Sequence, residues 1–176
     1  MKAPTTAKPR RRGASRSTAG TRAPGPAPVD PIVVRPVRRG DLPQVIAIDA
    51  TVTGLEKRDY WRSIYRRYGD SGQLGRQFLV ADIGDRVVGF VIGEVRDWEF
   101  GSPPCGWVFA IDVKPDSRQG GIGTRLLDAI CASFRRAGVR KVRTMLGRDN
   151  TLILSFFRSQ GMMAGPFIPL EMDLET

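Results

Sequence analysis

Apolar and polar residues alternate along several short segments of the chain, which is the pattern of β-strands that bury one face. Two of these segments lie on either side of Gly84 and Asp85, a dipeptide typical of hairpin turns. In a third, 107–113, strict alternation predicts that the odd-numbered residues share one face and the even-numbered residues the other. The predicted strands are 32–37, 78–83, 86–95, 107–113, 139–146 and 167–174.

Apolar residues recur at helical spacing in further segments between these strands. The first follows Asp41, which we expect to cap the free N–H groups of the helix, and the second covers 60–68. The longest begins in a glycine-rich turn at 118–123, and the last begins at Asn150. The element order β-α-α-β-β-β-α-β-α-β predicts an α/β domain with a mixed sheet, because hairpin-linked strands come first and β-α-β units follow.

The first 30 residues differ in composition from the rest of the chain. They hold seven basic residues against Asp30 alone, so they carry +6 of the formal +10, and they are rich in Pro, Ala, Ser, Thr and Gly. Before Val29 their only large apolar residue is Met1, so burial of apolar surface cannot offset the entropy of ordering. We therefore expect a disordered basic tail over 1–30 and one domain over 31–176. A solvated tail, a weak nucleic-acid contact and a targeting segment all stay open as its role.

The absence of histidine restricts the chemistry of the chain. It excludes a Ser-His-Asp triad, a Cys-His nucleophile pair and any His-ligated metal. Cys105 and Cys131 cannot form a four-cysteine zinc site and lack CxxC spacing, so we expect no metal and a reducing, cytoplasmic setting. No apolar run approaches the roughly 18 residues that a transmembrane helix needs, and no secretory signal is evident, so we expect no membrane association.

The turn after the segment 107–113 has the composition of a phosphate-binding site. Gly120, Gly121 and Gly123 lead into a predicted helix, whose free N–H groups and positive dipole end bind anions. Arg118 adds a permanent positive charge that can pair with phosphate. The turn lacks both the Gly-Lys-Ser/Thr ending of a Walker loop and the third glycine of a dinucleotide fingerprint. A plain helix start is the alternative explanation of these glycines.

Two motifs resemble those of a known family. The spacing Pro115-x-x-Arg118-x-x-Gly121-Ile122-Gly123 resembles the acyl-CoA pyrophosphate loop of the GNAT superfamily of N-acetyltransferases, Q/R-x-x-G-x-G/A. A second set resembles the family's N-x-x-A-x-x-x-Y-x-x-x-G-F helix and consists of Asn150, Ile153, Phe157, Gly161 and Met162. The element order is similar across residues 31–175, so the resemblance implies the GNAT-like acyl-CoA N-acyltransferase fold for nearly all of the ordered chain.

The resemblance also implies an activity, the transfer of an acetyl group from acetyl-CoA to a primary amine in a ternary complex. The pantetheine arm would lie between the strands at 107–113 and 139–146, and the glycine turn would hold the pyrophosphate. The cofactor-binding residues implied in this way are Ile111, Asp112, Val113, Arg118, Gln119, Gly120, Gly121, Ile122, Gly123, Thr124, Asn150 and Phe157. A GNAT-like acyl-CoA-binding or regulatory domain without efficient turnover is the alternative. Family habit alone suggests a homodimer.

Acetylation of an amine favours a general base, because a lysine-like amine of pKa about 10.4 costs about 4.6 kcal/mol to neutralise at pH 7. The resemblance is to a family in which one group of enzymes carries a glutamate at the position of Trp107 and another group carries one at the position of Met145. Neither residue of this chain is acidic, so the mechanism of neither group can be assigned to it. Glu94, late in the strand beside the central one, is the first candidate for the base, and Asp112 is the second. Phe157 stands where the family often has a tyrosine, and it cannot protonate the leaving thiolate.

Overall fold

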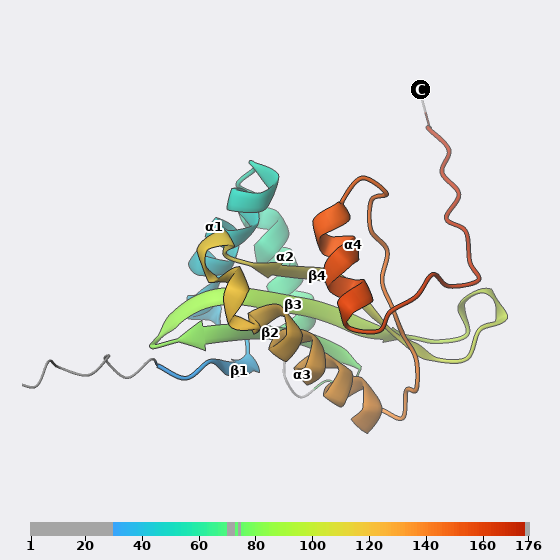
Figure 1. The fold of residues 1–176 in the computed structure, drawn as a ribbon, viewed down its shortest axis with the longest axis horizontal. Helices are drawn as coiled ribbons and strands as arrows, with labels where there is room; N and C mark the ends of the chain where they lie inside the picture. Colours follow the sequence, from blue (N-terminus) through green and yellow to red (C-terminus); the bar gives the residue numbers. More distant parts are fainter. Residues whose placement is uncertain (1–29, 70–72, 74, 175–176) are drawn as a thin grey trace, which may run out of the picture.

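A five-stranded mixed sheet forms the centre of the protein (Figure 1). The computed structural model describes residues 30–69, 73 and 75–174, so the tail predicted over 1–30 lies, except for Asp30, outside the described residues. The strands lie in sequence order, with β1 to β4 antiparallel and β5 parallel to β4, which confirms the predicted mixed sheet. They are β1 (Val33–Pro36), β2 (Arg76–Ile83), β3 (Arg86–Arg96), β4 (Cys105–Val113) and β5 (Val142–Arg143).

Helices cover both faces of this sheet (Figure 1). They are α1 (Leu42–Thr53), α2 (Arg58–Tyr68), α3 (Ile122–Arg136) and α4 (Thr151–Ser159), with short 3₁₀ turns η1 (Arg39–Asp41), η2 (Glu99–Gly101) and η3 (Pro115–Gly120). On one face α1 and α2 bury a core around Trp61 and Phe90, whose ring centroids are 5.0 Å apart. On the other face α3 buries a second core around Leu126 and Phe134, to which α4 contributes Phe157. No helix of the described residues is long and apolar enough to cross a membrane.

A β-bulge interrupts the pairing of β3 with β4. Ile92 lies opposite Ala110, but the next residue, Gly93, lies opposite Val108, so Phe109 has no residue opposite it. A Cβ atom at Gly93 would meet the backbone carbonyl of the neighbouring strand and the side chains of the α3 core. Glycine therefore permits the close approach of the two strands at this point.

The bulge makes the predicted alternation along 107–113 wrong. Val108 and Ile111 both contribute to the α3 core, whereas Ala110 packs against the core under α1 and α2. The ring of Phe109 lies 5.2 Å from that of Tyr68 in α2. One extra residue in a strand moves every later side chain to the opposite face, which a sequence pattern read along one strand cannot show.

The last two predicted strands need correction. The segment 139–146 forms backbone ladder pairs only at Val142 and Arg143, because beyond them the hydroxyl of Thr144, rather than a backbone N–H, donates to the carbonyl of Val108 at 2.8 Å. The segment 167–174 forms no strand, and its apolar side chains are exposed. Its alternating pattern is not sufficient, since a strand needs a neighbouring edge for its backbone hydrogen bonds and none is bonded to it in the described chain.

Asp41 does not cap α1, contrary to the prediction. Its carboxylate accepts hydrogen bonds from the guanidinium of Arg35 at 2.7 Å and from the backbone N–H of Arg38 at 2.6 Å. Arg35 also donates to Asp82 at 2.6 Å and so ties β1 and β2 to the start of α1. Burial alone would raise the pKa of Asp41, but the bonds from Arg35 and Arg38 outweigh it and hold the pKa below its ordinary value.

Candidate functional site

A cavity of about 840 Å³ opens where β4 and β5 separate. The last ladder pair is Trp107 with Arg143, and beyond Val108 the outer edge of β4 has no strand partner among the described residues. Helices α1 and α2 border the cavity on one face of the sheet and α4 borders it on the other. An extended ligand could therefore lie along the free edge of β4 in the manner of an added strand.

One end of the cavity is formed by η3 and the start of α3. Gly121 has a left-handed φ of +69° and no heavy atom within 4 Å of the position of an added Cβ. The first helical hydrogen bond here runs from the N–H of Arg125 to the carbonyl of Gly121 at 3.1 Å. The N–H groups of Ile122, Gly123 and Thr124 therefore precede the helical ladder, as an anion site at a helix N-terminus requires.

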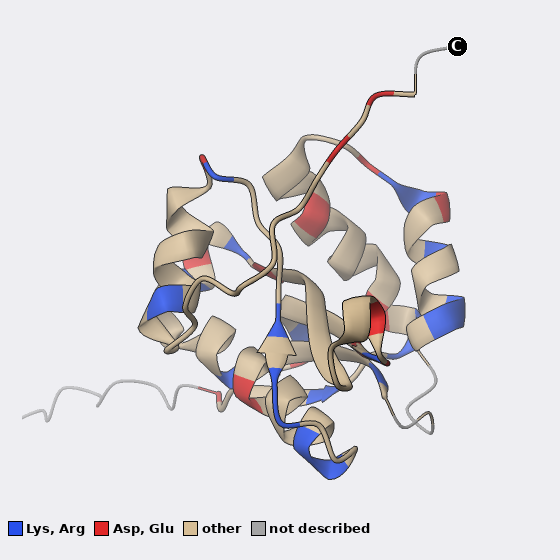
Figure 2. Ribbon diagram, turned by 90° about the vertical axis from the view of Figure 1, so that its right-hand side faces the viewer, with Lys and Arg blue, Asp and Glu red and all other residues tan. Residues whose placement is uncertain are grey.

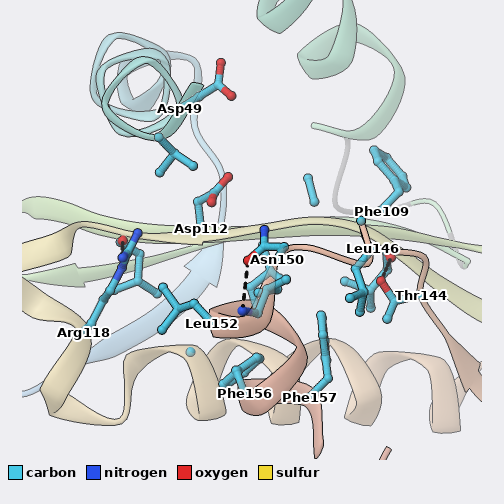
Figure 3. A pocket seen from close by; sticks show the side chains of 18 of the residues that line it. Asp49, Phe109, Asp112, Arg118, Thr144, Leu146, Asn150, Leu152, Phe156 and Phe157 are labelled. Carbon is cyan, nitrogen blue, oxygen red and sulfur yellow. Dashed lines mark hydrogen bonds between the residues drawn. The ribbon is translucent and has the colours of Figure 1, made fainter. Parts of the chain in front are cut away.

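Arg118 adds positive charge at the same end. Its Nε donates to the carbonyl of Val113 at 3.2 Å, and this bond holds the exposed side chain over the end of β4. The two terminal NH₂ groups form no further hydrogen bond within the described ranges. Figure 3 shows Arg118 at the edge of the cavity, where a guanidinium can form paired bonds with phosphate oxygens.

The α4 side of the cavity is largely apolar (Figure 3). Phe157 is only 4% exposed, and its ring centroid lies 5.2 Å from that of Phe156. Leu146 and Leu152 extend this wall. Asn150 faces the cavity and also accepts a hydrogen bond from the N–H of Ile153 at 3.2 Å, so its side chain caps α4.

The opposite wall carries two aspartates. Asp49 of α1 is 4% exposed and is fully partnered, because its carboxylate accepts from Lys57 Nζ at 3.0 Å and from Trp61 Nε1 at 2.9 Å. Asp112 of β4 points toward α1 in Figure 3, and its carboxylate has neither a hydrogen bond nor an ion pair within the part of the chain that is described. Burial, followed by the negative charge of Asp49, raises the pKa of Asp112 to about 6, against the opposing effects of Arg118 and Lys57.

Glu94, the first candidate for the base, is not part of the cavity lining. Its carboxylate accepts from the hydroxyl of Tyr68 at 2.9 Å and from Nε of Arg96 at 3.1 Å. Burial and this bond to Glu94 raise the pKa of Tyr68. The ring of Tyr68 contacts Phe109, which does line the cavity, and Glu94 lies directly opposite Trp107 in the β3–β4 register.

The structure brings most of the predicted cofactor residues together. Those that line the cavity are Ile111, Asp112, Val113, Arg118, Gly121, Gly123, Thr124, Asn150 and Phe157. Gln119 and Gly120 lie exposed in η3, and the side chain of Ile122 is buried in the α3 core, so only its backbone can serve a ligand.

The predictions from the sequence place no candidate site residue on α1 or α2, and the structure adds Asp49, Lys57 and Tyr60 to the cavity lining. One signal was present in the sequence. Asp49 follows Val45 by four residues and therefore lies on the apolar side of a predicted helix. A carboxylate that is buried at such a position needs a hydrogen-bonding or charged partner.

Basic residues on the domain are distributed over several elements (Figure 2). In that view, blue segments lie on separate helices and strands, with red segments between them. Several basic side chains of α2 are paired or exposed, including Arg58 with Glu56 and Arg62 with Asp59 at 3.1 Å. In the described residues, no three Asp, Glu or Cys side chains gather closely enough to hold a metal ion.

Comparison with known proteins gives one family match and several distant relatives. Residues 46–162 match the model of the acetyltransferase (GNAT) family. An L-2,4-diaminobutyric acid acetyltransferase from Nocardia farcinica is 31% identical over 87 residues, which cover 49% of this chain and 44% of that protein. A mycothiol acetyltransferase from Saccharomonospora viridis is 32% identical over 87 residues, which cover 48% of this chain and 28% of that protein. The chain thus matches less than half the length of these curated relatives.

Solved structures resemble the fold of this protein over a longer part of the chain than the curated relatives match. The aminoglycoside N-acetyltransferase AAC(6')-Iy in complex with CoA superimposes with a TM-score of 0.73 at 16% identity, over 84% of this chain and 98% of that chain. At this identity the match concerns the arrangement of helices and strands, and it confirms the predicted fold.

Proposed function

Because the chain belongs to the GNAT family of acetyltransferases, we propose that it transfers the acetyl group of acetyl-CoA to a primary amine in a ternary complex. The observation that carries this proposal is one continuous cavity that joins the glycine turn before α3, the free edge of β4 and a wall with a carboxylate, that of Asp112, which has no partner in the described part of the chain. The similarity to a diaminobutyric acid acetyltransferase and to an aminoglycoside N-acetyltransferase supports acetyl transfer to an amino compound.

The cofactor residues divide into three groups along the cavity. The N–H groups before α3 and the guanidinium of Arg118 bind the pyrophosphate, since both present donors to an anion. The backbone of Ile111, Asp112 and Val113 binds the pantetheine arm along the free edge of β4. Phe157 packs beside the arm, and Asn150 lies near its thioester end.

The reaction forms a bond between the amine nitrogen and the acetyl carbon and breaks the bond between that carbon and the sulfur. The amine loses a proton, and we propose Glu94 as its acceptor, directly or through water. Glu94 lies opposite Trp107, the position at which some relatives carry a glutamate, and side chains opposite each other in antiparallel strands are roughly 5 Å apart. Asp112, inside the cavity, remains the alternative base.

Departure of the thiolate requires less help from the protein. A thiol has a pKa near ~8.5, so its anion is a tolerable leaving group without a positioned acid. The side chain of Phe157 supplies no proton, so the remaining donors are water and the tyrosines of α2, of which Tyr60 lines the cavity.

Release of CoA from acetyl-CoA in the presence of lysine peptides, α-amino peptides, polyamines and small amines tests the activity. Turnover with at least one class is expected. Tight binding of acetyl-CoA without turnover of any of them would refute acetyl transfer to these classes and favour the acyl-CoA-binding alternative.

Glu94→Gln tests the base. We expect a fall in kcat/KM of about 10²-fold or more at neutral pH and a smaller fall at high pH, where more of the amine is already neutral. Glu171→Gln removes the same charge from the exposed C-terminal segment and should leave the rate unchanged. Equal rates for Glu94→Gln and the wild-type protein would exclude Glu94. A homodimer and a nucleic-acid contact of residues 1–30 stay predictions.

A further inference from the structure

The side chains of α1 and α2 that line the cavity have no role in binding the cofactor in the scheme above. Val52 and Tyr60 line it and are 47% and 44% exposed. Exposed apolar side chains that gather around a concave surface commonly mark a binding site. The apolar part of a second substrate can therefore pack against this wall.

Among the described residues, four charged side chains line the cavity, and two of them, Asp49 and Lys57, pair with each other. Asp49 is neutralised by Lys57 and is further bonded to Trp61. Arg118 lies at the phosphate end and is bonded to the end of β4. Asp112 is thus the one carboxylate of the cavity lining without a partner in the described residues, and a partly buried charge of this kind is best satisfied by a cation.

The position of Asp112 along β4 separates it from the reacting end of the cavity. Asp112 lies opposite Phe90, and Ala110, on the same face, lies opposite Ile92 next to the bulge. Two residues along a strand span about 7 Å. Glu94, the proposed base, lies beyond the bulge on the same side, because its bond to Tyr68 connects it with Phe109.

We propose that the acceptor is a diamine or a larger polycationic amine, whose second ammonium group is bound by Asp112 while the reacting amine lies at the bulge. This inference rests on the proposed acetyl transfer and specifies its acceptor. Asp112 acts here as a specificity residue, because an ammonium group forms charge-assisted hydrogen bonds with a partly buried carboxylate. The carbon chain between the two nitrogens lies against the apolar side chains of the α1–α2 wall.

The test compares 1,4-diaminobutane with 1-aminobutane, which has the same carbon chain and lacks the second ammonium group. For the wild-type protein we expect kcat/KM to be about 10- to 100-fold higher for the diamine. In Asp112→Asn this ratio should fall to near one. Because the ratio is taken within one variant, any general effect of the substitution on cofactor binding or on the rate cancels.

Asp128→Asn is the matched control, since it removes an exposed carboxylate from α3 outside this cavity and should keep the wild-type ratio. A ratio near one in the wild-type protein, or an unchanged ratio in Asp112→Asn, would overturn the inference. The second outcome, with both amines slowed equally, would assign Asp112 to the chemical step instead.

A binding measurement separates this inference from the proposed activity. Calorimetry on the protein saturated with CoA should show tighter binding of 1,4-diaminobutane than of 1-aminobutane, with the difference lost in Asp112→Asn. If this preference holds and no amine is acetylated, acetyl transfer fails and the cation site stands. If amines are acetylated and no preference for the diamine exists, acetyl transfer stands and the cation site at Asp112 is refuted.

Discussion

Asp112 should make the folded protein less stable at neutral pH. Its pKa is raised to about 6 from 3.8, mainly by burial and then by Asp49, so the folded state binds this proton more tightly than the unfolded chain does. Between these two pH values the unfolded chain has released the proton while the folded protein retains part of it. The contribution of Asp112 to stability therefore falls as the pH rises through this range, and the full penalty is present above about pH 6.

The size of the penalty follows from the same two values. The interval from 3.8 to about 6 corresponds to about 3 kcal/mol at about 1.36 kcal/mol per pH unit. Solvent screens part of this because the side chain is not fully buried, so we expect Asp112→Asn to raise the free energy of unfolding by about 1–2 kcal/mol at about pH 8. Asn has nearly the same shape, and the substitution removes no hydrogen bond made by this carboxylate within the described chain.

Urea unfolding measures this difference. The curves of wild-type and Asp112→Asn protein, followed by the fluorescence of the buried Trp61, should differ at about pH 8 and converge toward about pH 4. Asp128→Asn should match the wild-type protein at both pH values, since this side chain is exposed. A variant no more stable than the wild-type protein at about pH 8, or one with an equal advantage at both pH values, would refute the reasoning.

Three further substitutions test other parts of the structure. Arg118→Gln should raise the Kd for acetyl-CoA by about 10- to 100-fold in calorimetry, and an unchanged Kd would remove Arg118 from the phosphate site. Asp41→Asn should lower the free energy of unfolding by about 2–3 kcal/mol at neutral pH. Because the pKa of Asp41 lies below 3.8, that stability is present above this value and lost as the pH falls, so urea midpoints that differ equally at low pH would contradict it. Phe157→Tyr should leave kcat in the CoA-release assay nearly unchanged, because the thiolate is a tolerable leaving group, and a rise of about tenfold or more would show instead that proton donation limits turnover.

The glycine turn and the start of α3, where we propose that the cofactor binds, were predictable because they are local in sequence. The residues from Pro115 to Gly123 are contiguous, and their positions follow from one turn and one helix start. The seven-residue spacing of Asn150 and Phe157, about two helical turns, likewise places both on the side of α4 that lines the cavity. Short-range geometry of this kind is fixed by backbone conformation, so the motif and the structure agree.

The α1–α2 wall of the cavity, which we propose binds the acceptor, was not predictable because it depends on contacts between distant segments. Asp49 and Asp112 are on α1 and β4, and no local pattern indicates that they border the same cavity. The bulge at Phe109 also has no local signature, since it is defined only by the register with β3. The apolar segment 167–174 shows the opposite failure, in which the local pattern of a strand is present without a partner.

Register also changes how the position of a general base should be compared between relatives. When only the sequence of β4 is compared, Trp107 stands where some GNAT enzymes have a glutamate, and that comparison shows no equivalent of the glutamate in this chain. In the sheet, Glu94 lies opposite that position on β3, where its carboxylate is bonded to Tyr68 next to the bulge. Opposite residues of antiparallel strands reach the same small volume, so a carboxylate can come from either strand without a change of fold. The double variant Glu94→Gln/Trp107→Glu therefore tests whether a glutamate at position 107 can replace Glu94 as the base. We expect it to restore a measurable part of the lost kcat/KM, and a double variant no faster than Glu94→Gln would refute it.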